Sequence, residues 1–297
     1  MRICIADFYV DIECNDDGAD TLPNLKPFIA SRNETDKHAP ICRIHTGQHV
    51  DANETAPTLC YDSDGRTVRL WLMPDRCIIS LSFHDSRNVY SLEADRHWNS
   101  VLTDWKPDEA DASAALNDLI MVSFVYSSAF HNCTAIHASC VAIGDCGCAF
   151  IGPSGIGKST HSKLWLQNIP GTRLINDDQP IVRLHADGQI YIYGSPWSGK
   201  TRCYRNEGVK LKSIFFMEQA SENEALRLSG IETFRRLMPA TSLIGRDTVS
   251  FEHISRTQAS IAGMIPAYLL RNRPDKKAAE LSNRLFVISQ TTSTEQQ

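Results

Sequence analysis

The chain has 297 residues, of which 42% are hydrophobic and 22% are charged, a composition typical of one large or two modest globular domains. Its formal net charge of −5 gives no electrostatic reason to expect a nucleic-acid partner. No stretch approaches the ~20 apolar residues of a membrane helix, and the first residues lack the apolar core of a secretory signal. We therefore expect no membrane partner and a cytoplasmic location.

Ten cysteines are scattered along the chain, at positions 4, 14, 42, 60, 77, 133, 140, 146, 148 and 203. None forms a Cys-x-x-Cys pair, so the spacing gives little support to a zinc site. Free cysteine packs as a small hydrophobic side chain, and we expect reduced, mostly buried thiols.

Residues 1–105 are predicted to form a β-rich N-terminal region that carries no catalytic pattern. Residues 3–10 and 68–72 are predicted to be strands, separated by turns that contain Asn, Asp, Gly and Pro. The polar segment 31–66 is expected to be loop-like, with room for short strands.

A second domain is predicted over residues 106–290, followed by a flexible tail at 291–297. A helix from Asp108 to about His131 is expected to open this domain, because its apolar residues form a broad stripe. The pattern then predicts a hairpin of residues 138–143 and 147–151, with its turn at 144–146.

The hairpin leads into a complete phosphate-binding loop, Gly-x-x-x-x-Gly-Lys-Ser. Its glycines let backbone N–H groups turn toward a di- or triphosphate, its lysine adds positive charge, and its serine can hold Mg²⁺. An apolar run precedes the loop and a segment able to form a helix follows it, which is the context that the motif requires. The predicted nucleotide-binding residues are Gly152, Pro153, Ser154, Gly155, Ile156, Gly157, Lys158, Ser159 and Thr160.

The remaining elements alternate between strands and helices, which favours the α/β class. We expect the core of this domain to hold a mixed sheet with flanking helices. Pro170-Gly171 is expected to end the loop helix. Further strands are predicted at 173–176, 189–193, 210–217 and 265–270, and helices at 231–237 and from Pro274 to about Leu285.

Two adjacent acids, Asp177 and Asp178, stand at the end of an apolar strand, 19 and 20 residues beyond Lys158. A nucleotide bound through Mg²⁺ needs a carboxylate near the metal, and transfer to a hydroxyl benefits from a second one that accepts the proton. The alternative is a solvated turn, since Asp-Asp before Gln-Pro is also turn chemistry.

His137 and a basic cluster complete the set of candidates. His137 lies fifteen residues before Gly152, although a lone histidine is more often structural. Lys200, Arg202 and Arg205 supply the cations that a transferring phosphoryl group needs, unless they form an ordinary basic surface loop. The candidate catalytic residues are therefore Asp177, His137, Lys158, Lys200, Arg202 and Arg205.

The ordered set His137-Ala138-Ser139, Gly152 to Ser159 and Asn176-Asp177-Asp178 resembles the HPr kinase/phosphorylase superfamily, whose nucleotide site is similar to that of ATP-dependent phosphoenolpyruvate carboxykinase. The resemblance covers about residues 130–215 and implies a kinase core of that type with ATP and Mg²⁺ as cofactors. It also implies that His137 assists near the acceptor, that Asp177 is the general base, and that Asp178 and Ser159 hold Mg²⁺.

Residues 193–200, Tyr-Gly-Ser-Pro-Trp-Ser-Gly-Lys, depart from the bacterial HPr kinases, which carry a Leu-Glu-Ile-Arg-Gly signature linked to the phosphorylase reaction. The form found here is similar to that of HPr-kinase-like proteins beside peptide-modifying genes, some of which phosphorylate a serine of a small peptide. The expected partners are a nucleotide and a hydroxyl acceptor on a peptide, a small protein or a small metabolite, and a homo-oligomer is compatible with the sequence.

Two other function classes stay open on the sequence. An ABC-type or other P-loop ATPase shares the loop, and Leu228-Ser229-Gly230-Ile231-Glu232 faintly resembles its signature. Against it, about 150 residues precede the loop and no run of four aliphatics leads into Asp-Glu. A non-catalytic nucleotide-binding scaffold is the other alternative, prompted by residues 194–200.

Overall fold

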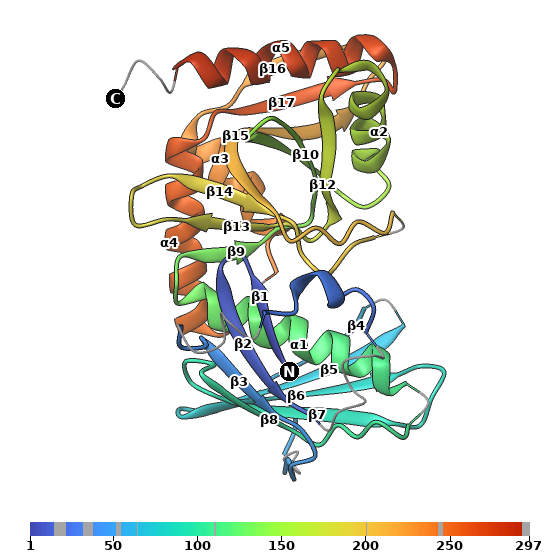
Figure 1. Cartoon of the computed structure of the whole chain (residues 1–297), viewed down its shortest axis with the longest axis vertical. Coiled ribbons are helices and arrows are strands. Elements are labelled where there is room, and N and C mark those ends of the chain that lie inside the picture. Colours follow the sequence, from blue (N-terminus) through green and yellow to red (C-terminus); the bar gives the residue numbers. More distant parts are fainter. Residues whose placement is uncertain are drawn as a thin grey trace. The chain divides into compact units, whose positions relative to one another are not determined.

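The computed structural model describes residues 1–14, 22–31, 38–51, 55–63, 65–109, 111–199, 201–242 and 246–292. The chain divides into two compact units, Met1–His131 and Asn132–Gln297, each built on its own mixed β-sheet (Figure 1). The described residues contain five α-helices and two large sheets, which confirms the α/β class. None of these helices is long and apolar enough to cross a membrane.

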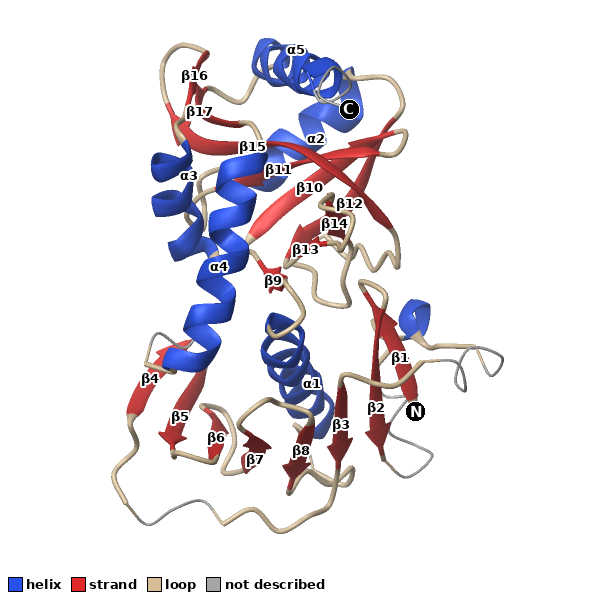
Figure 2. Cartoon of the chain, turned by 90° about the vertical axis from the view of Figure 1, so that its left-hand side faces the viewer, coloured by secondary structure: helices blue, strands red, loops and turns tan. Residues whose placement is uncertain are grey.

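The first unit is an eight-stranded sheet with the order β1-β2-β3-β8-β7-β6-β5-β4. Its strands are β1 Arg2–Ile5, β2 Phe8–Glu13, β3 Cys42–His45, β4 Leu59–Ser63, β5 Arg66–Leu72, β6 Arg76–Phe83, β7 Val89–Asp95 and β8 Ser100–Thr103. A short 3-10 helix, η1, spans Lys26–Phe28. Helix α1 (Ala112–Ala129) packs against β3 and β7, so it belongs to this unit, although the sequence placed it at the start of the second domain (Figure 2).

The predicted single strand over residues 3–10 is wrong, because the chain reverses at Ala6 and Asp7. These two residues have φ values of 50° and 62°, and β1 and β2 pair antiparallel around them, with Ile5 opposite Phe8. Two left-handed residues suit the twist of a tight hairpin, where Gly or Asn is usual. Without glycine at the turn, the apolar run gave no signal of a reversal.

The second unit holds a nine-stranded sheet with the path β12-β10-β11-β15-β14-β13-β9. Strand β17 also pairs with β15, and β16 pairs with β17. The strands are β9 Cys133–Ala135, β10 Ala138–Ile143, β11 Cys146–Ile151, β12 Thr172–Asp178, β13 Ile181–Leu184, β14 Ile190–Tyr193, β15 Gly208–Gln219, β16 Glu224–Arg227 and β17 Ala267–Asn272. Strands β11, β15 and β17 run parallel, so their carboxyl ends share one edge of the sheet.

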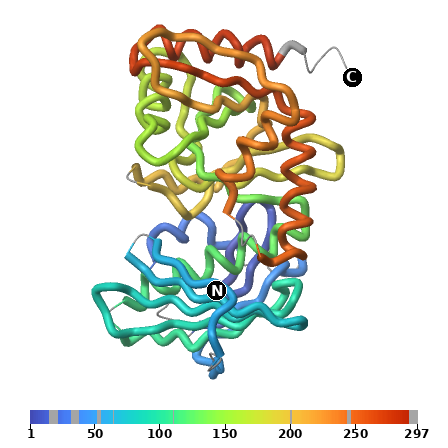
Figure 3. The backbone as a smooth tube through the Cα atoms, turned by 180° about the vertical axis from the view of Figure 1, so that it is seen from behind, coloured from blue at the N-terminus to red at the C-terminus, as the bar shows by residue number. Residues whose placement is uncertain are grey.

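Helices cover both faces of this sheet, because side chains alternate between the faces along each strand. Phe150 of β11 packs with residues of α2 (Lys158–Asn168) and α5 (Lys276–Thr292) on one face. Its neighbours Ala149 and Ile151 pack on the other face with residues of α3 (Gly230–Leu237) and α4 (Thr248–Met264). A 3-10 turn, η2, at Met238–Ala240 follows α3. Figure 3 shows α4 and α5 running in different directions through this unit.

The hairpin of β10 and β11 forms as predicted, with Ile143 opposite Cys146. Helix α4 and strands β13 and β16 were not predicted. Helix α4 buries Ser250, Thr257 and Gln258 beside its apolar residues, so its sequence lacks a continuous apolar stripe. Helix α5 extends beyond Leu285 to Thr292, and the last five residues of the expected tail, 293–297, lie outside the described residues.

Candidate functional site

The glycine-rich loop joins the end of β11 to the start of α2. Gly155 and Gly157 have φ values of 80° and 110°, a region that other residues rarely adopt. A Cβ on Gly152 would lie 3.3 Å from the carbonyl oxygen of Met217 on the neighbouring strand β15. The backbone N–H of Ile156 donates to the Pro153 carbonyl at 3.2 Å and closes the turn. The structure therefore has the strand, turn and helix that a phosphate-binding loop requires.

The rest of the loop is open to ligands. Pro153, Ser154 and Thr160 are exposed, and Ser159 is half-buried in the first turn of α2. The first N–H groups of a helix have no partner within the helix and carry a partial positive charge, which suits a phosphate.

Lys158 is folded back onto the loop. Its ammonium donates to the carbonyl oxygens of Gly152 at 2.8 Å and Pro153 at 3.3 Å. It also lies 2.9 Å from Nε2 of His137. Burial lowers the pKa of Lys158, while the charges of Asp178 and Asp177 act in the opposite direction. A phosphate arriving at the loop would take over the contacts that these carbonyl oxygens now make.

His137 connects the loop lysine to the acid pair, Asp177 and Asp178. It lies between β9 and β10, and its backbone N–H donates to the Ala240 carbonyl at 2.6 Å. Its Nδ1 is 3.0 Å from Oδ1 of Asp178. Asp178, His137 and Lys158 are thus in continuous contact, and we call them the polar triplet.

The acid pair forms the end of β12, where the sequence placed it. Asp177 lies opposite Ser139 and Asp178 opposite Ala138 on β10. Neighbouring strand residues point to opposite faces, which separates the two carboxylates. Asp178 reaches His137, whereas Asp177 is only 7% exposed and its Oδ1 has no hydrogen-bond partner among the described residues. An unpaired buried carboxylate oxygen is costly, which makes it suited to a bound ligand.

Asn176 positions the acid pair, a role that the sequence reasoning did not assign. Its buried Oδ1 accepts the backbone N–H groups of Asp178 and Gln179, both at 2.9 Å. Its Nδ2 donates to Oγ of Ser195 and the carbonyl of Trp197, both at 3.1 Å. The sequence signal for this role is the position of Asn176 directly before the two acids.

The segment from Gly194 to Gly199 passes along the acid pair. Ser198 forms an isolated β-bridge with Asp178, and a Cβ on Gly199 would lie 3.0 Å from the Asp177 carbonyl oxygen. At Gly194 a Cβ would lie 2.9 Å from the Ile175 carbonyl oxygen and closer still to that of Arg205. The backbone approaches closely here, so this segment has little freedom to move.

Replacing Gly194 with alanine is expected to lower the free energy of unfolding by about 2–3 kcal/mol, because backbone rather than a rotatable side chain blocks the new methyl group. Gly263→Ala in α4 is the matched control, since nothing lies within 4 Å of a Cβ there. Urea unfolding measures both variants. Equal stability of Gly194→Ala and the wild type would contradict the prediction.

The two described basic candidates, Arg202 and Arg205, are not bonded to the polar triplet. Arg202 is exposed, and the exposed Arg205 lies beside Cys203, with its Nη1 3.9 Å from Oε2 of Glu207. Within the described ranges, no hydrogen bond or ion pair joins either arginine to the polar triplet. Lys200 lies outside the described residues.

Mg²⁺ fits the oxygen atoms found at this site. The described part of the chain contains no group of three or more His, Cys, Asp or Glu residues arranged around a metal. Mg²⁺ bound with a nucleotide needs only one or two carboxylates, because phosphate and water complete its shell. The half-exposed carboxylate of Asp178 and the hydroxyl of Ser159 are oxygen ligands of the kind that this requires.

His161, one turn into α2, is a buried group outside the polar triplet. Only 1% of it is exposed, its Nε2 lies 2.9 Å from Oγ of Ser282 on α5, and its Nδ1 has no partner within the described residues. Burial lowers the pKa of His161 from 6.5 to about 4. Between these two values the unfolded chain binds a proton that the folded chain excludes, so stability falls as the pH falls from 6.5 to 4.

Between pH 6.5 and 4, the wild type is expected to lose up to about 3 kcal/mol of unfolding free energy through His161, and the substitution His161→Gln should remove this loss. Urea unfolding of both proteins at pH 7, 5.5 and 4.5 tests it, because carboxylates common to the two proteins cancel in the difference. A constant difference across these pH values would refute the role of His161.

The chain matches no family model and no curated protein. Among solved structures, it aligns with the HPr(Ser) kinase/phosphatase from Coxiella burnetii at 13% identity, over 54% of this chain and 96% of that one, with a TM-score of 0.31. The likeness is distant. It carries no argument about the reaction, which must come from the geometry of the site itself.

Proposed function

We propose that this chain is an ATP-dependent kinase that transfers the γ-phosphoryl group to a hydroxyl, on a serine of a peptide or small protein or on a small metabolite. The observation that carries the proposal is the contact of Asp178, His137 and Lys158 at the base of a glycine loop, with the buried Asp177 preceding Asp178 in β12. Phosphoryl transfer needs cations and helix N–H groups around the phosphates and a carboxylate at the attacking hydroxyl.

The loop binds the phosphates. Lys158 exchanges its contacts with the Gly152 and Pro153 carbonyl oxygens for β- and γ-phosphate oxygens. The exchange needs only the movement of the lysine side chain. It replaces neutral carbonyl partners of the ammonium with negatively charged phosphate oxygens, which form stronger hydrogen bonds. The N–H groups of the loop and the start of α2 hold the remaining phosphate oxygens.

The acid pair acts at the opposite end of the transferred group. Asp177 accepts the proton of the attacking hydroxyl, because its buried Oδ1 has no hydrogen-bond partner within the described residues. Asp178 orients His137 through its Nδ1, so that Nε2 is directed at Lys158. In this position His137 assists near the hydroxyl acceptor. When bound, Mg²⁺ held by Asp178 and Ser159 supplies positive charge for the phosphate oxygens.

The proposal includes a P-loop core of the HPr kinase and phosphoenolpyruvate carboxykinase type. It is supported by the arrangement of the hairpin, the loop and the acid strand in one sheet, where β10 lies between β11 and β12. An ABC-type assignment finds less support. The residues that resemble its signature, Ser229 and Glu232, form a capping box at the start of α3, which accounts for their pattern.

Incubation with Mg-ATP labelled at the γ-phosphate, together with pools of Ser-containing peptides and hydroxylated metabolites, tests the proposal. Transfer to an acceptor by the wild type, and loss of it in Asp177→Asn, is the expected result. Tight ATP binding without transfer to any acceptor would favour a non-catalytic scaffold instead. No ATP binding at all would exclude both functions.

A further inference from the structure

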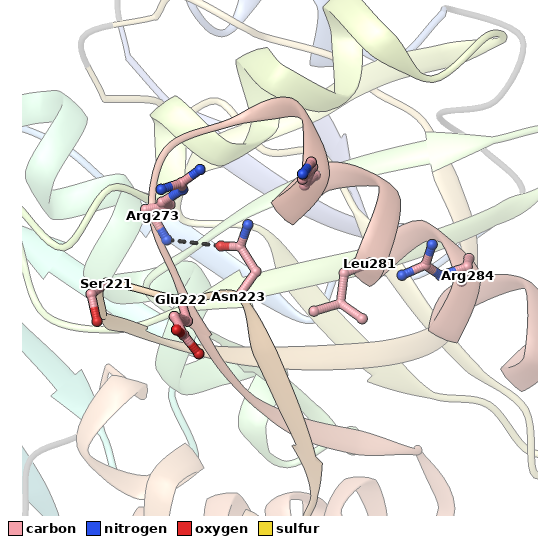
Figure 4. Close-up of a pocket in the computed structure, with 7 residues that line it drawn as sticks. Ser221, Glu222, Asn223, Arg273, Leu281 and Arg284 are labelled. Carbon is pink, nitrogen blue, oxygen red and sulfur yellow. Dashed lines mark hydrogen bonds between the residues drawn. The ribbon is translucent and has the colours of Figure 1, made fainter.

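A pocket of about 380 Å³ opens in the second unit between the turn after β15 and the start of α5. Figure 4 shows Leu281 and Arg284 projecting from α5, with Arg273 and Asn223 facing one another across a hydrogen bond. The lining consists of Ser221, Glu222, Asn223, Arg273, Lys277, Leu281 and Arg284.

The wall of this pocket is held together by Asp275. Its Oδ1 accepts from Nδ2 of Asn223 at 2.9 Å, and its Oδ2 accepts from Nε of Arg273 at 2.6 Å. The same Oδ1 accepts the backbone N–H of Ala278 at 2.9 Å and caps α5. The backbone N–H of Arg273 donates to Oδ1 of Asn223 at 3.0 Å. The bond from Nε of Arg273 to Asp275 holds the guanidinium beside the start of α5.

The pocket and the phosphate-binding loop lie at the same edge of the sheet. Ile151, the last residue of β11, is level with Phe216 of β15, and Met217 is level with Leu270 of β17. Most of the pocket residues come a few positions after the ends of β15 and β17. They therefore lie roughly 10 Å beyond the loop in the strand direction, and roughly 10 Å from it across the sheet. Ligands of such sheets bind outside the carboxyl ends of the strands.

The order of the strands sets the direction of a nucleotide at this edge. The acid pair on β12 and His137 before β10 lie on one side of β11, and β15 and β17 lie on the other. If the γ-phosphate points toward the acid pair, the nucleoside leaves the loop toward β15 and β17. The pocket lies on that side of the loop, at the ends of β15 and β17.

We propose that this pocket binds the nucleoside of the nucleotide, a purine base with its ribose; the inference rests on the proposed kinase function. The guanidinium of Arg273 offers a flat surface on which a base stacks, and Leu281 adds an apolar contact. The carboxylate of Glu222 accepts hydrogen bonds from ribose hydroxyls. Lys277 and Arg284 balance the charge of the nearest phosphate.

Calorimetry with two probes separates the nucleoside from the phosphates: Mg-ATP and Mg-tripolyphosphate, which has no nucleoside. In Arg273→Ala and in Glu222→Ala, ATP affinity is expected to fall about tenfold while tripolyphosphate affinity stays within about twofold. Arg256→Ala, an exposed arginine on α4 paired with Glu252, is the matched control and should bind both probes as the wild type does.

Glu222→Ala matters because Glu222 is exposed and has no part in capping α5, so its loss spares the fold. Unchanged ATP affinity in both pocket variants would overturn the inference, as would an equal loss for ATP and tripolyphosphate. Wild-type protein that binds tripolyphosphate as tightly as ATP would also overturn it, while leaving the phosphate site intact. Binding of neither probe by the wild type would overturn the proposed function itself.

Discussion

Asp177→Asn is expected to lower kcat for phosphoryl transfer by about 10²–10⁴-fold and to leave ATP affinity within about threefold of the wild type. Asparagine has the shape of aspartate but cannot take the proton of the attacking hydroxyl. Asp177 is almost fully buried and one of its oxygens has no partner within the described residues, so the substitution breaks no known contact at that oxygen. Steady-state kinetics with the identified acceptor and calorimetry with Mg-ATP measure the two effects.

The matched control is Asp145→Asn, an exposed acid in the turn between β10 and β11 of the same sheet. It should retain wild-type kcat. A kcat for Asp177→Asn close to that of the wild type would remove Asp177 as the base. A parallel loss of ATP affinity would instead indicate that Asp177 acts mainly through the nucleotide or its metal ion.

Lys158→Met is expected to weaken binding of Mg-ATP by about 10²–10³-fold, because the loop loses the charge that meets the outer phosphates. The unliganded protein should hardly change in stability. Burial lowers the pKa of Lys158, so its charge has a cost in the folded state that methionine avoids, and this offsets the lost bonds to Gly152 and Pro153. Calorimetry measures the affinity, and thermal unfolding without nucleotide should give a Tm within about 3 °C of the wild type.

Lys163→Met is the control, since Lys163 is exposed on the same helix two turns from the loop's glycines. It should bind ATP like the wild type. Wild-type ATP affinity in Lys158→Met would mean that the loop does not bind phosphates. A large fall in Tm, well beyond the expected range, would assign Lys158 a structural role within the loop.

Local elements near the loop could be predicted because their causes lie within a few residues. Alternating small and apolar residues gave the β10–β11 hairpin, and the glycines at 155 and 157 supply backbone angles that other residues avoid. The acids at 177 and 178 could be singled out by type and spacing. Their position opposite Ser139 and Ala138 could not be predicted, because it depends on how β12 pairs with β10.

Helix α4 could not be predicted from the periodicity of apolar residues. Its buried Gln258 donates to the hydroxyls of Thr134 and Thr241, partners distant in sequence, so a polar residue occupies a core position. Periodicity treats such residues as exposed and therefore hides the helix. The reversal at Ala6 and Asp7 was also hidden from the sequence pattern. No glycine marks the turn, and the pairing of β1 with β2 favours it instead.

The amino-acid sequence by itself determined the strand, glycine turn and helix around residues 151–168, because this local structure depends on residues close together in the chain. Only the tertiary structure decided that His137 bridges Lys158 and Asp178, that Asp177 is buried, and that Asn176 holds the acid pair in place. Such contacts join residues from separate strands, and their distances are set by strand pairing and packing, which no spacing along the chain encodes.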